Sequence, residues 1–320
     1  MKAVVRERYG SLELREADPP VAADDEVLVR VRASSVNPAD WYAMNGTPLV
    51  GRVEMGLRRP KQLVLGVDFA GVVEAVGKGV THFGPGDEVF GGRSGALAEY
   101  VAVPEARAIA AKPANVTFEE AAAVPVAALT ALQGLRDKGR VQPGQTVLIN
   151  GASGGVGTFA VQIAKSLGAE VTGVCSTRNV DLVRSLGADH VVDYTREDFT
   201  RSDRRYDVLL DVAGSRRWSE CKRVLAPRAR VVMVGAPKGS RLLGPLRHLL
   251  ATRIVAIPSG RQVGFFVAKF SKADVEALRE LLEAGTIRSV VDRRYPLSDV
   301  AEAFRYLGEG HAQAKVVVTI

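Results

Sequence analysis

The feature that most constrains the fold is a glycine-rich segment that follows an apolar run. Residues 146–150 (TVLIN) predict a buried strand, and Gly151-Ala152-Ser153-Gly154-Gly155-Val156-Gly157 comes directly after it. Beyond the glycines, apolar side chains recur at helical spacing as far as Leu167, and Gly168 ends the pattern. A strand, a tight turn and a helix in this order predict the start of a βαβ unit.

The glycines also indicate what the turn binds. Gly154 and Gly155 leave the backbone open to a ligand, and Gly157 lets the helix pack close to the strand while its N–H groups face an anion. The strict G-x-G-x-x-G spacing is not met, because Ala152 stands at its first glycine. We expect a dinucleotide pyrophosphate at Ser153, Gly154, Gly155 and Val156. A glycine-rich turn without a ligand is the alternative.

The end of the next strand bears on the choice of dinucleotide. Residues 170–175 predict this strand, and NAD-binding chains usually place an acid after it for the ribose 2′-hydroxyl. Here Ser176, Thr177 and Arg178 follow instead. Hydroxyls and a guanidinium suit a 2′-phosphate, which a carboxylate would repel. We therefore predict NADPH as the cofactor, with Ser176 and Arg178 at its 2′-phosphate; an exposed arginine that binds nothing is the alternative.

Strands and helices alternate over the middle of the chain. Strands are expected at 146–150, 171–175, 191–193, 207–211, 230–234 and 254–257, which predicts a doubly wound parallel sheet. Before them, short strands such as 27–33 and 72–76 between glycine turns predict an antiparallel, barrel-like domain. Thr117 and Glu120 form a capping box that begins a helix. The tail, with helices at 271–284 and 298–307 and a strand at 315–320, is expected to return to the first domain.

Length and composition narrow the class of protein. With 320 residues, 47% of them hydrophobic and 25% charged, the chain predicts a soluble protein of two domains. No run of apolar residues is long enough to span a membrane and no signal-peptide core is seen, so a cytoplasmic location is expected. Its two cysteines supply no disulfide framework. The net charge of +7 suits an anionic cofactor, and the low aromatic content of 6% speaks against nucleic-acid binding.

Several short motifs, in order, carry a family resemblance. They are Asn37-Pro38-Ala39-Asp40, residues 66–73 (GVDFAGVV), 85–89 (PGDEV), 128–131 (ALTA), the glycine turn, 185–189 (SLGAD) and 315–318 (KVVV). With them the chain resembles the medium-chain dehydrogenase/reductase superfamily, in its zinc-free branch of quinone oxidoreductases and enone reductases. The resemblance implies an α/β fold in which a GroES-like catalytic domain (1–121) is completed by 263–320 around a Rossmann domain (122–262). It also implies a homodimer joined through strand 254–257.

Residue chemistry separates the chain from the zinc enzymes of the same superfamily. Those enzymes place a Cys in the segment that matches Asn37 to Asp40, and a Gly-His-Glu where this chain has Gly66-Val67-Asp68. The two cysteines and four histidines have no metal-ligand spacing, so we predict a zinc-independent enzyme. Asp68 is read as a turn residue, with metal ligation as the alternative.

Without a Lewis acid, the hydride acceptor must take up charge itself. Quinones and α,β-unsaturated carbonyls do so, because conjugation spreads the developing charge onto an oxygen. Asn37 is the candidate for positioning near the nicotinamide and the acceptor. The resemblance places Tyr42 over the nicotinamide, where its phenol donates to the enolate oxygen or relays a proton. Packing of Trp41 and Tyr42 into the barrel wall, with protonation by solvent, is the alternative.

The resemblance implies further cofactor contacts from Thr130, Tyr194, Val212, Ala213, Gly235, Phe265, Phe266, Val267 and Lys315, the last reaching the cofactor or the substrate. Core packing is the other interpretation for the phenylalanines.

Two segments are unusual: residues 49–62 lengthen the loop beside the acceptor site, and residues 241–253 form a basic, leucine-rich helix. That helix packs on the sheet or touches a membrane.

The function predicted from the sequence is therefore reduction of a small quinone or enone by NADPH, without zinc. An enoyl-thioester or aldehyde reductase is the rival among enzymes. An NADPH-binding sensor or RNA-binding protein is the rival from another class.

Overall fold

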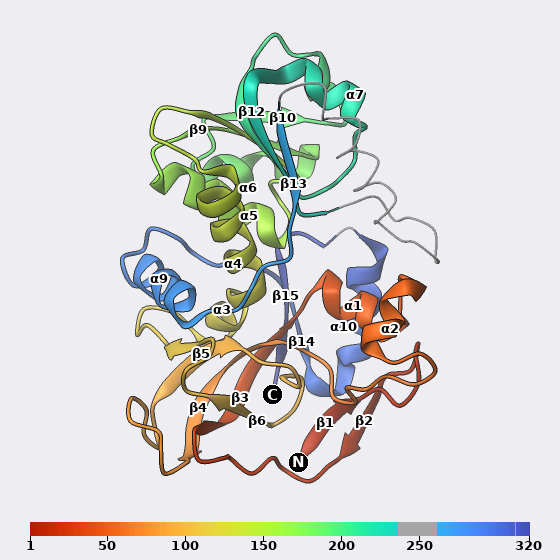
Figure 1. Ribbon diagram of the computed structural model, residues 1–320, viewed down its shortest axis with the longest axis vertical. Helices are drawn as coiled ribbons and strands as arrows, with labels where there is room; N and C mark the ends of the chain where they lie inside the picture. Colours follow the sequence, from red (N-terminus) through yellow and green to blue (C-terminus); the bar gives the residue numbers. More distant parts are fainter. Residues whose placement is uncertain (236–260, 311) are drawn as a thin grey trace. The chain divides into compact units, whose positions relative to one another are not determined.

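The structure, a computed structural model, describes residues 1–235, 261–310 and 312–320. It divides into a terminal unit, Met1–Leu129 with Lys269–Ile320, and a central unit, Thr130–Ala268 (Figure 1). The helix expected at 241–253 and the strand expected at 254–257 lie outside the described residues. Each unit is built around its own sheet.

The sheet of the central unit consists of parallel strands in the order β10-β9-β8-β11-β12-β13. The chain therefore builds outward from β8 to one side and from β11 to the other, and the order reverses between these two strands. Such a switch point is where doubly wound sheets bind ligands, at the carboxyl ends of the strands. The strands are β8 (Thr146–Asn150), β9 (Glu170–Cys175), β10 (His190–Asp193), β11 (Tyr206–Asp211), β12 (Leu225–Met233) and β13 (Gln262–Phe265).

Helix α5 begins immediately after the glycine turn. It spans Gly155–Ser166, and its apolar residues, from Phe159 to Ala164, are buried as the helical spacing predicts. Gly168 has a φ of +78°, which suits the turn that ends the helix. The other helical segments of this part of the chain are α4 (Pro125–Gln133), a π-helical turn (Gly134–Gly139), α6 (Val180–Ser185) and α7 (Trp218–Cys221).

The terminal unit contains a mixed sheet in the order β14-β15-β3-β4-β5-β7, with β6 paired to β3. The C-terminal strand β15 pairs antiparallel with β3 and parallel with β14, so the tail completes the sheet of the N-terminal segment as predicted. The strands are β3 (Glu26–Val36), β4 (Asp68–Val76), β5 (Glu88–Gly92), β6 (Tyr100–Pro104), β7 (Ile109–Ala111), β14 (Val291–Pro296) and β15 (Lys315–Thr319), beside the hairpin of β1 (Lys2–Val5) and β2 (Glu13–Glu16).

The capping box is present where the sequence predicts it. Thr117 Oγ1 accepts from the backbone N–H of Glu120 at 3.2 Å, and the backbone N–H of Thr117 donates to Glu120 Oε2 at 2.8 Å. The helix that follows, α3, spans only Phe118–Ala122, because a new helix begins at Pro125. The remaining helices of the terminal unit are α1 (Pro38–Asn45), α2 (Arg52–Met55), α9 (Lys272–Glu283) and α10 (Val300–Glu309).

Both predicted architectures are thus observed, a doubly wound parallel sheet and a mostly antiparallel sheet made from both ends of the chain. Within the described ranges, none of the helices has the length and apolar character needed to cross a bilayer.

Candidate functional site

Strand register brings a cluster of buried polar side chains together in the terminal unit. Val316 of β15 lies opposite Val36 of β3, which places Lys315 beside Asn37. Ser35 of β3 lies opposite Asp68, the first residue of β4. The three neighbouring strands therefore deliver Lys315, Asn37 and Asp68 to one place. Asp68 is fully buried, and Lys315 and Asn37 are each 3% exposed.

The centre of this cluster is a buried ion pair. Lys315 Nζ lies 3.2 Å from Asp68 Oδ2 and donates to Asn37 Oδ1 at 2.5 Å. Asp68 Oδ2 also accepts from Ser35 Oγ at 2.6 Å and from Asn37 Nδ2 at 2.9 Å. The backbone N–H of Val126 donates to Asp68 Oδ1 at 2.8 Å. A buried charge is tolerated when it is paired and hydrogen-bonded in this way.

The cluster continues into the first turn of α1. Asn37 is the N-cap of this helix, and its backbone N–H donates to Asp40 Oδ2 at 2.9 Å. Asp40 is 4% exposed, and its burial raises the pKa of the carboxyl to about 7, with a further contribution from the charge of Asp68. The sequence pointed to Asn37 but not to Asp40, although both belong to the same Asn-Pro-Ala-Asp motif.

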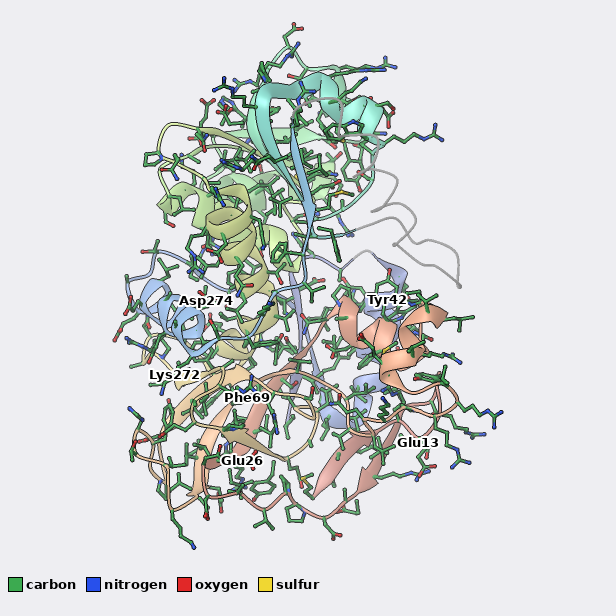
Figure 2. The ribbon with its side chains drawn as sticks, viewed as in Figure 1. Glu13, Glu26, Tyr42, Phe69, Lys272 and Asp274 are labelled. Carbon is green, nitrogen blue, oxygen red and sulfur yellow. The ribbon has the colours of Figure 1, made fainter. Side chains whose placement is uncertain are left out.

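Tyr42 lies two residues beyond Asp40, on the same helix (Figure 2). Its ring is half-buried and meets Trp41 edge-to-face, with ring centroids 5.4 Å apart. Among the described residues no hydrogen-bond partner is recorded for the Tyr42 hydroxyl. The ring is therefore in contact with that of Trp41, while the hydroxyl remains able to bond a ligand, and both interpretations of Tyr42 stay predictions.

In the central unit, the glycine turn is shaped by close backbone approaches. Gly151 has a φ of +92°, a conformation that suits glycine. A Cβ at Gly157 would lie 2.0 Å from Gly151 O, whereas one at Gly154 would meet only that same oxygen at 3.5 Å. Gly157 is thus required for packing, and Gly154 borders open space. The spacing Gly151-x-x-Gly154-x-x-Gly157 replaces the strict motif, and the sequence analysis, which quoted Gly151 as the start of the turn, assigned it no role.

Asn179 connects the glycine turn to the segment after β9. Its Nδ2 donates to Ser153 Oγ at 2.9 Å and to Ser176 Oγ at 3.2 Å, so both predicted serines share one amide. Asn179 is 5% exposed, and its Oδ1 is buried with no partner among the described residues. Arg178, between these residues, is exposed. Sequence reasoning missed Asn179, because an asparagine that follows a strand usually signals only a turn.

An acid that contacts this segment is Asp193, at the end of β10. Thr177 Oγ1 donates to Asp193 Oδ2 at 2.6 Å, and Thr195 binds Oδ1 through its hydroxyl and its backbone N–H. The hydrogen bond from Thr177 lowers the pKa of the Asp193 carboxyl, and the bonds from Thr195 add to this effect. Both carboxylate oxygens are therefore already bound within the protein. A hollow of about 400 Å³ adjoins them, lined by Thr177, Val180, Asp181, Arg184, Val191, Asp193, Arg196 and Glu197.

The carboxyl ends of β8, β11 and β12 meet at the switch point. Asn150 Nδ2 donates to Asp211 Oδ1 at 2.8 Å, and Asn150 O accepts from the backbone N–H groups of Val212 and Ala213. A Cβ at Gly235 would lie 1.9 Å from Val212 O, so only glycine fits there. The structure thus brings three predicted residues, Val212, Ala213 and Gly235, close to one another.

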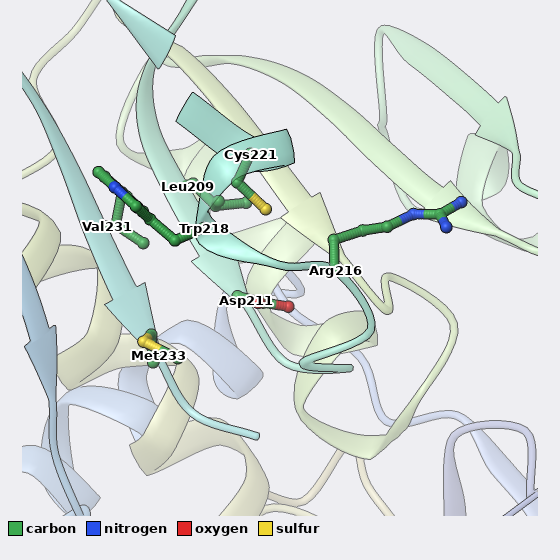
Figure 3. A pocket seen from close by; sticks show the side chains of 7 residues that line it. All are labelled: Leu209, Asp211, Arg216, Trp218, Cys221, Val231 and Met233. Carbon is green, nitrogen blue, oxygen red and sulfur yellow. The ribbon is translucent and has the colours of Figure 1, made fainter. Parts of the chain in front are cut away.

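A second cavity, beneath these strand ends, is too small for a cofactor. Its volume is about 10 Å³, roughly that of one water molecule. Figure 3 shows the Asp211 carboxyl at this cavity, while the guanidinium of Arg216 extends away from it. The lining residues are Leu209, Asp211, Arg216, Trp218, Cys221, Val231 and Met233.

The other predicted cofactor residues are spread over several elements. Tyr194 is 55% exposed. Phe265, the last residue of β13, is 46% exposed. Of the two residues that follow it, Phe266 is half-buried and Val267 is 74% exposed. Thr130 is 8% exposed in α4. Their cofactor contacts stay predictions. The Lys315 ammonium binds Asn37 and Asp68 within the terminal unit, and its contact with the cofactor or the substrate also stays a prediction.

Comparisons with known proteins address the family. Residues 23–114 match the alcohol dehydrogenase GroES-like domain, and residues 186–318 match the zinc-binding dehydrogenase family. A mitochondrial NAD(P)H oxidoreductase of Mus musculus is 34% identical over 359 residues, covering 100% of this chain and 89% of its own length. The chain belongs to the medium-chain dehydrogenase/reductase superfamily, in its quinone and enone reductase branch.

Other members of the superfamily agree with this placement. A chloroplastic NADPH-dependent alkenal/one oxidoreductase of Arabidopsis thaliana is 34% identical, covering 99% of this chain and 79% of its own length. The structure of Escherichia coli quinone oxidoreductase complexed with NADPH superposes with a TM-score of 0.84 at 26% identity, covering both chains completely. The predicted fold, a GroES-like domain with a Rossmann domain, is confirmed.

The donor atoms of the cluster around Asp68 are not those that a zinc site usually offers. The segments that match the Cys and the Gly-His-Glu of the zinc enzymes contain the amide of Asn37 and the carboxylate of Asp68, and both groups already bind the Lys315 ammonium. Nowhere in the described ranges do three His, Cys, Asp or Glu side chains gather as a metal site would require. Burial raises the thiol pKa of Cys175 to about 11 and that of Cys221 to about 12, which disfavours the thiolate that zinc needs.

The raised pKa of the Asp40 carboxyl predicts that the free energy of unfolding depends on pH. Burial raises its pKa from 3.8 to about 7, so between these values the folded protein binds the proton more tightly than the unfolded chain. This contribution to the free energy of unfolding is greatest below about pH 4 and falls by up to about 4 kcal/mol as the pH rises to about 7. Asp40→Asn should remove this decline and be at least as stable as the unmodified protein at neutral pH.

Urea unfolding measured by Trp41 fluorescence tests this prediction. The Trp218→Phe background leaves Trp41 as the only tryptophan, so the signal reports the terminal unit. The exposed carboxyl of Asp18 provides a matched control, and Asp18→Asn should follow the unmodified protein at every pH. Parallel pH profiles for Asp40→Asn and the unmodified protein would show that Asp40 is not the responsible group.

Proposed function

We propose that this chain is an NADPH-dependent, zinc-independent reductase that transfers hydride to a quinone or an α,β-unsaturated carbonyl. The observation that carries the proposal is the Lys315 ammonium bound to Asp68 and Asn37, because it gives this cluster a resident cation in place of a metal. Relatives that are at least 30% identical include an alkenal/one oxidoreductase, and the fold is that of a quinone oxidoreductase.

The central unit offers groups that suit a dinucleotide. The open space at Gly154 and the first turn of α5 suit the pyrophosphate, and the buried Oδ1 of Asn179 can accept from a ligand hydroxyl. Ser176 and the exposed Arg178 would hold the 2′-phosphate. Asp193 does not compete for this position, because Thr177 and Thr195 occupy its oxygens. When bound, NADPH supplies the hydride.

The terminal unit would contribute the groups that act on the acceptor. Both ends of the Asn37 amide are engaged with Lys315 and Asp68, so we assign Asn37 a positioning role through its cap of α1. Tyr42 is the residue of that helix with an available hydroxyl. A phenol that donates to the acceptor oxygen stabilises the negative charge that develops as hydride arrives.

The oligomeric state and the cellular location of the protein are part of the proposal. We infer a homodimer in the cytoplasm, as the family resemblance and the sequence suggest. The mouse relative is mitochondrial, so fractionation of the native cell is the direct test of location.

Cofactor preference is the first test. NADPH should bind at least about tenfold more tightly than NADH, a difference of about 1.4 kcal/mol, because Ser176 and Arg178 bind the 2′-phosphate. Arg178→Ala should erase most of this preference while leaving the affinity for NADH unchanged. Fluorescence titration gives both dissociation constants, and Arg107→Ala, at an exposed arginine of the terminal unit, is the control. Equal affinities for both cofactors in the unmodified protein would refute the assignment.

The acceptor and the metal can be tested together. Oxidation of NADPH should proceed with a quinone and an enone, and more slowly with a simple aldehyde, because an isolated carbonyl cannot spread the developing charge by conjugation when no Lewis acid is present. Faster oxidation with an enoyl thioester than with either of the first two would favour the rival enoyl-thioester reductase. Activity should persist in a chelator, and elemental analysis should find less than stoichiometric zinc. One tightly bound zinc per chain whose removal abolishes activity would overturn the zinc-independent mechanism.

Tyr42→Phe separates oxyanion stabilisation from packing. The change removes the hydroxyl and keeps the ring, so kcat on an enone should fall by roughly 10²-fold, as for the loss of an oxyanion donor. Quinones accept hydride more readily and should be affected less. Tyr100→Phe, at a half-buried tyrosine of the same unit, is the control. A kcat within about threefold of the original, a barrier change below about 1 kcal/mol, would mean that the ring only packs and solvent protonates the product.

A further inference from the structure

Exposed apolar side chains gather on one short stretch of the terminal unit. Residues 49–63 include the short helix α2 and the loop after it, and they carry five large apolar side chains that are 39–71% exposed. These are Leu49, Val50, Val53, Leu57 and Leu63. Contiguous apolar exposure of this kind usually marks an interaction surface. We call residues 49–63 the basic apolar patch.

Basic side chains accompany these apolar ones. Arg52, Arg58, Arg59 and Lys61 lie in the same stretch, which has Glu54 as its single acid. Arg58, Arg59 and Lys61 are exposed, and within the described residues no ion pair is recorded for any of them. The patch therefore presents unneutralised positive charge beside apolar surface.

Hydrogen bonds and a cation–π contact connect the patch to the rest of the terminal unit. Tyr9 Oη donates to Gly56 O at 2.6 Å, and the Arg52 guanidinium stacks over the Tyr9 ring at 4.0 Å and donates from Nε to Gly46 O at 2.9 Å. The backbone N–H of Lys61 donates to Met55 O at 2.8 Å and closes the loop. Because this loop is closed at its base, Leu57, Arg58 and Arg59 form an exposed tip on an ordered support.

We propose that the basic apolar patch docks this protein on the surface of an anionic lipid bilayer. Val53 and Leu57 enter the headgroup region, where burial of their side chains is favourable, and Arg58, Arg59 and Lys61 bind lipid phosphates. The docking is peripheral, since α2 spans only Arg52–Met55. It does not depend on the identity of the hydride acceptor.

The positive charge of the patch favours an anionic bilayer over a second copy of the chain as its partner. A symmetric contact through this patch would bring the arginines of both copies together, which is unfavourable. An anionic bilayer offers complementary charge and an apolar layer at once.

Co-sedimentation of the full chain with vesicles tests the proposal. Vesicles of phosphatidylcholine with about 30 mol % phosphatidylglycerol should bind the protein, and binding should weaken as salt is raised, because anionic lipid attracts the arginines. Pure phosphatidylcholine should bind it poorly. Arg58→Glu with Arg59→Glu should lower the vesicle partition coefficient at least about tenfold. Val53→Ser with Leu57→Ser should lower it several-fold.

Matched variants guard against non-specific effects. Lys78→Glu with Arg107→Glu changes the net charge equally at exposed sites elsewhere, and Val21→Ser removes an apolar side chain that is 89% exposed. Both should bind vesicles like the unmodified protein, and all variants should keep its melting temperature. Equal loss in the charge control, or no vesicle binding at all, would overturn the proposal. Loss in the charge-reversed patch variant, with none in Val53→Ser with Leu57→Ser, would show adsorption by charge alone and would contradict the proposed burial of these two side chains. A sedimentation coefficient that changes in a patch variant without lipid would indicate that the patch forms a contact between copies instead.

Discussion

The terminal unit depends on the ion pair between Lys315 and Asp68. The two residues stand 247 positions apart, at the starts of β15 and β4, with β3 between these strands. A buried carboxylate that loses its cationic partner costs several kcal/mol, so the C-terminal strand, which carries Lys315, stabilises the start of β4. Asn37 accepts from the same ammonium and caps α1, which carries Tyr42. One interaction thus sets the register of three strands and the start of the helix on which the proposed chemistry relies.

The central unit depends on backbone proximity rather than on charge. Gly157 brings α5 against the turn after β8, and Gly235 lets the end of β12 approach that of β11. Asn179 then ties the turn to the segment after β9. These contacts fix the strand ends on both sides of the switch point, where the fold class binds its ligands.

Local sequence signals predicted much of this structure. The glycine turn, the alternation of strands and helices and the Thr117 capping box are each readable within a few residues, and all are observed. The site was harder to predict, because it depends on register between distant strands. The family resemblance assigned Lys315 to the cofactor or the substrate, and nothing in the neighbouring residues shows that Lys315 meets Asp68. The two hydrogen bonds that Asn179 donates also join Ser153 to Ser176, which lie in segments that are distant in the sequence. The exposure of the apolar side chains in residues 49–63 depends on which other segments pack against them, and the sequence does not show this.

The measurement that tests this account most directly is a double-mutant cycle between Lys315 and Asp68. It uses urea unfolding with Trp41 as the only tryptophan. Lys315→Met should lower the free energy of unfolding by about 3–5 kcal/mol, because it leaves the Asp68 carboxylate buried and unpaired. Adding Asp68→Asn should restore at least half of that loss, since the unpaired charge of Asp68 is then removed as well. A small cost for Lys315→Met, or two costs that simply add, would contradict the central role of the ion pair.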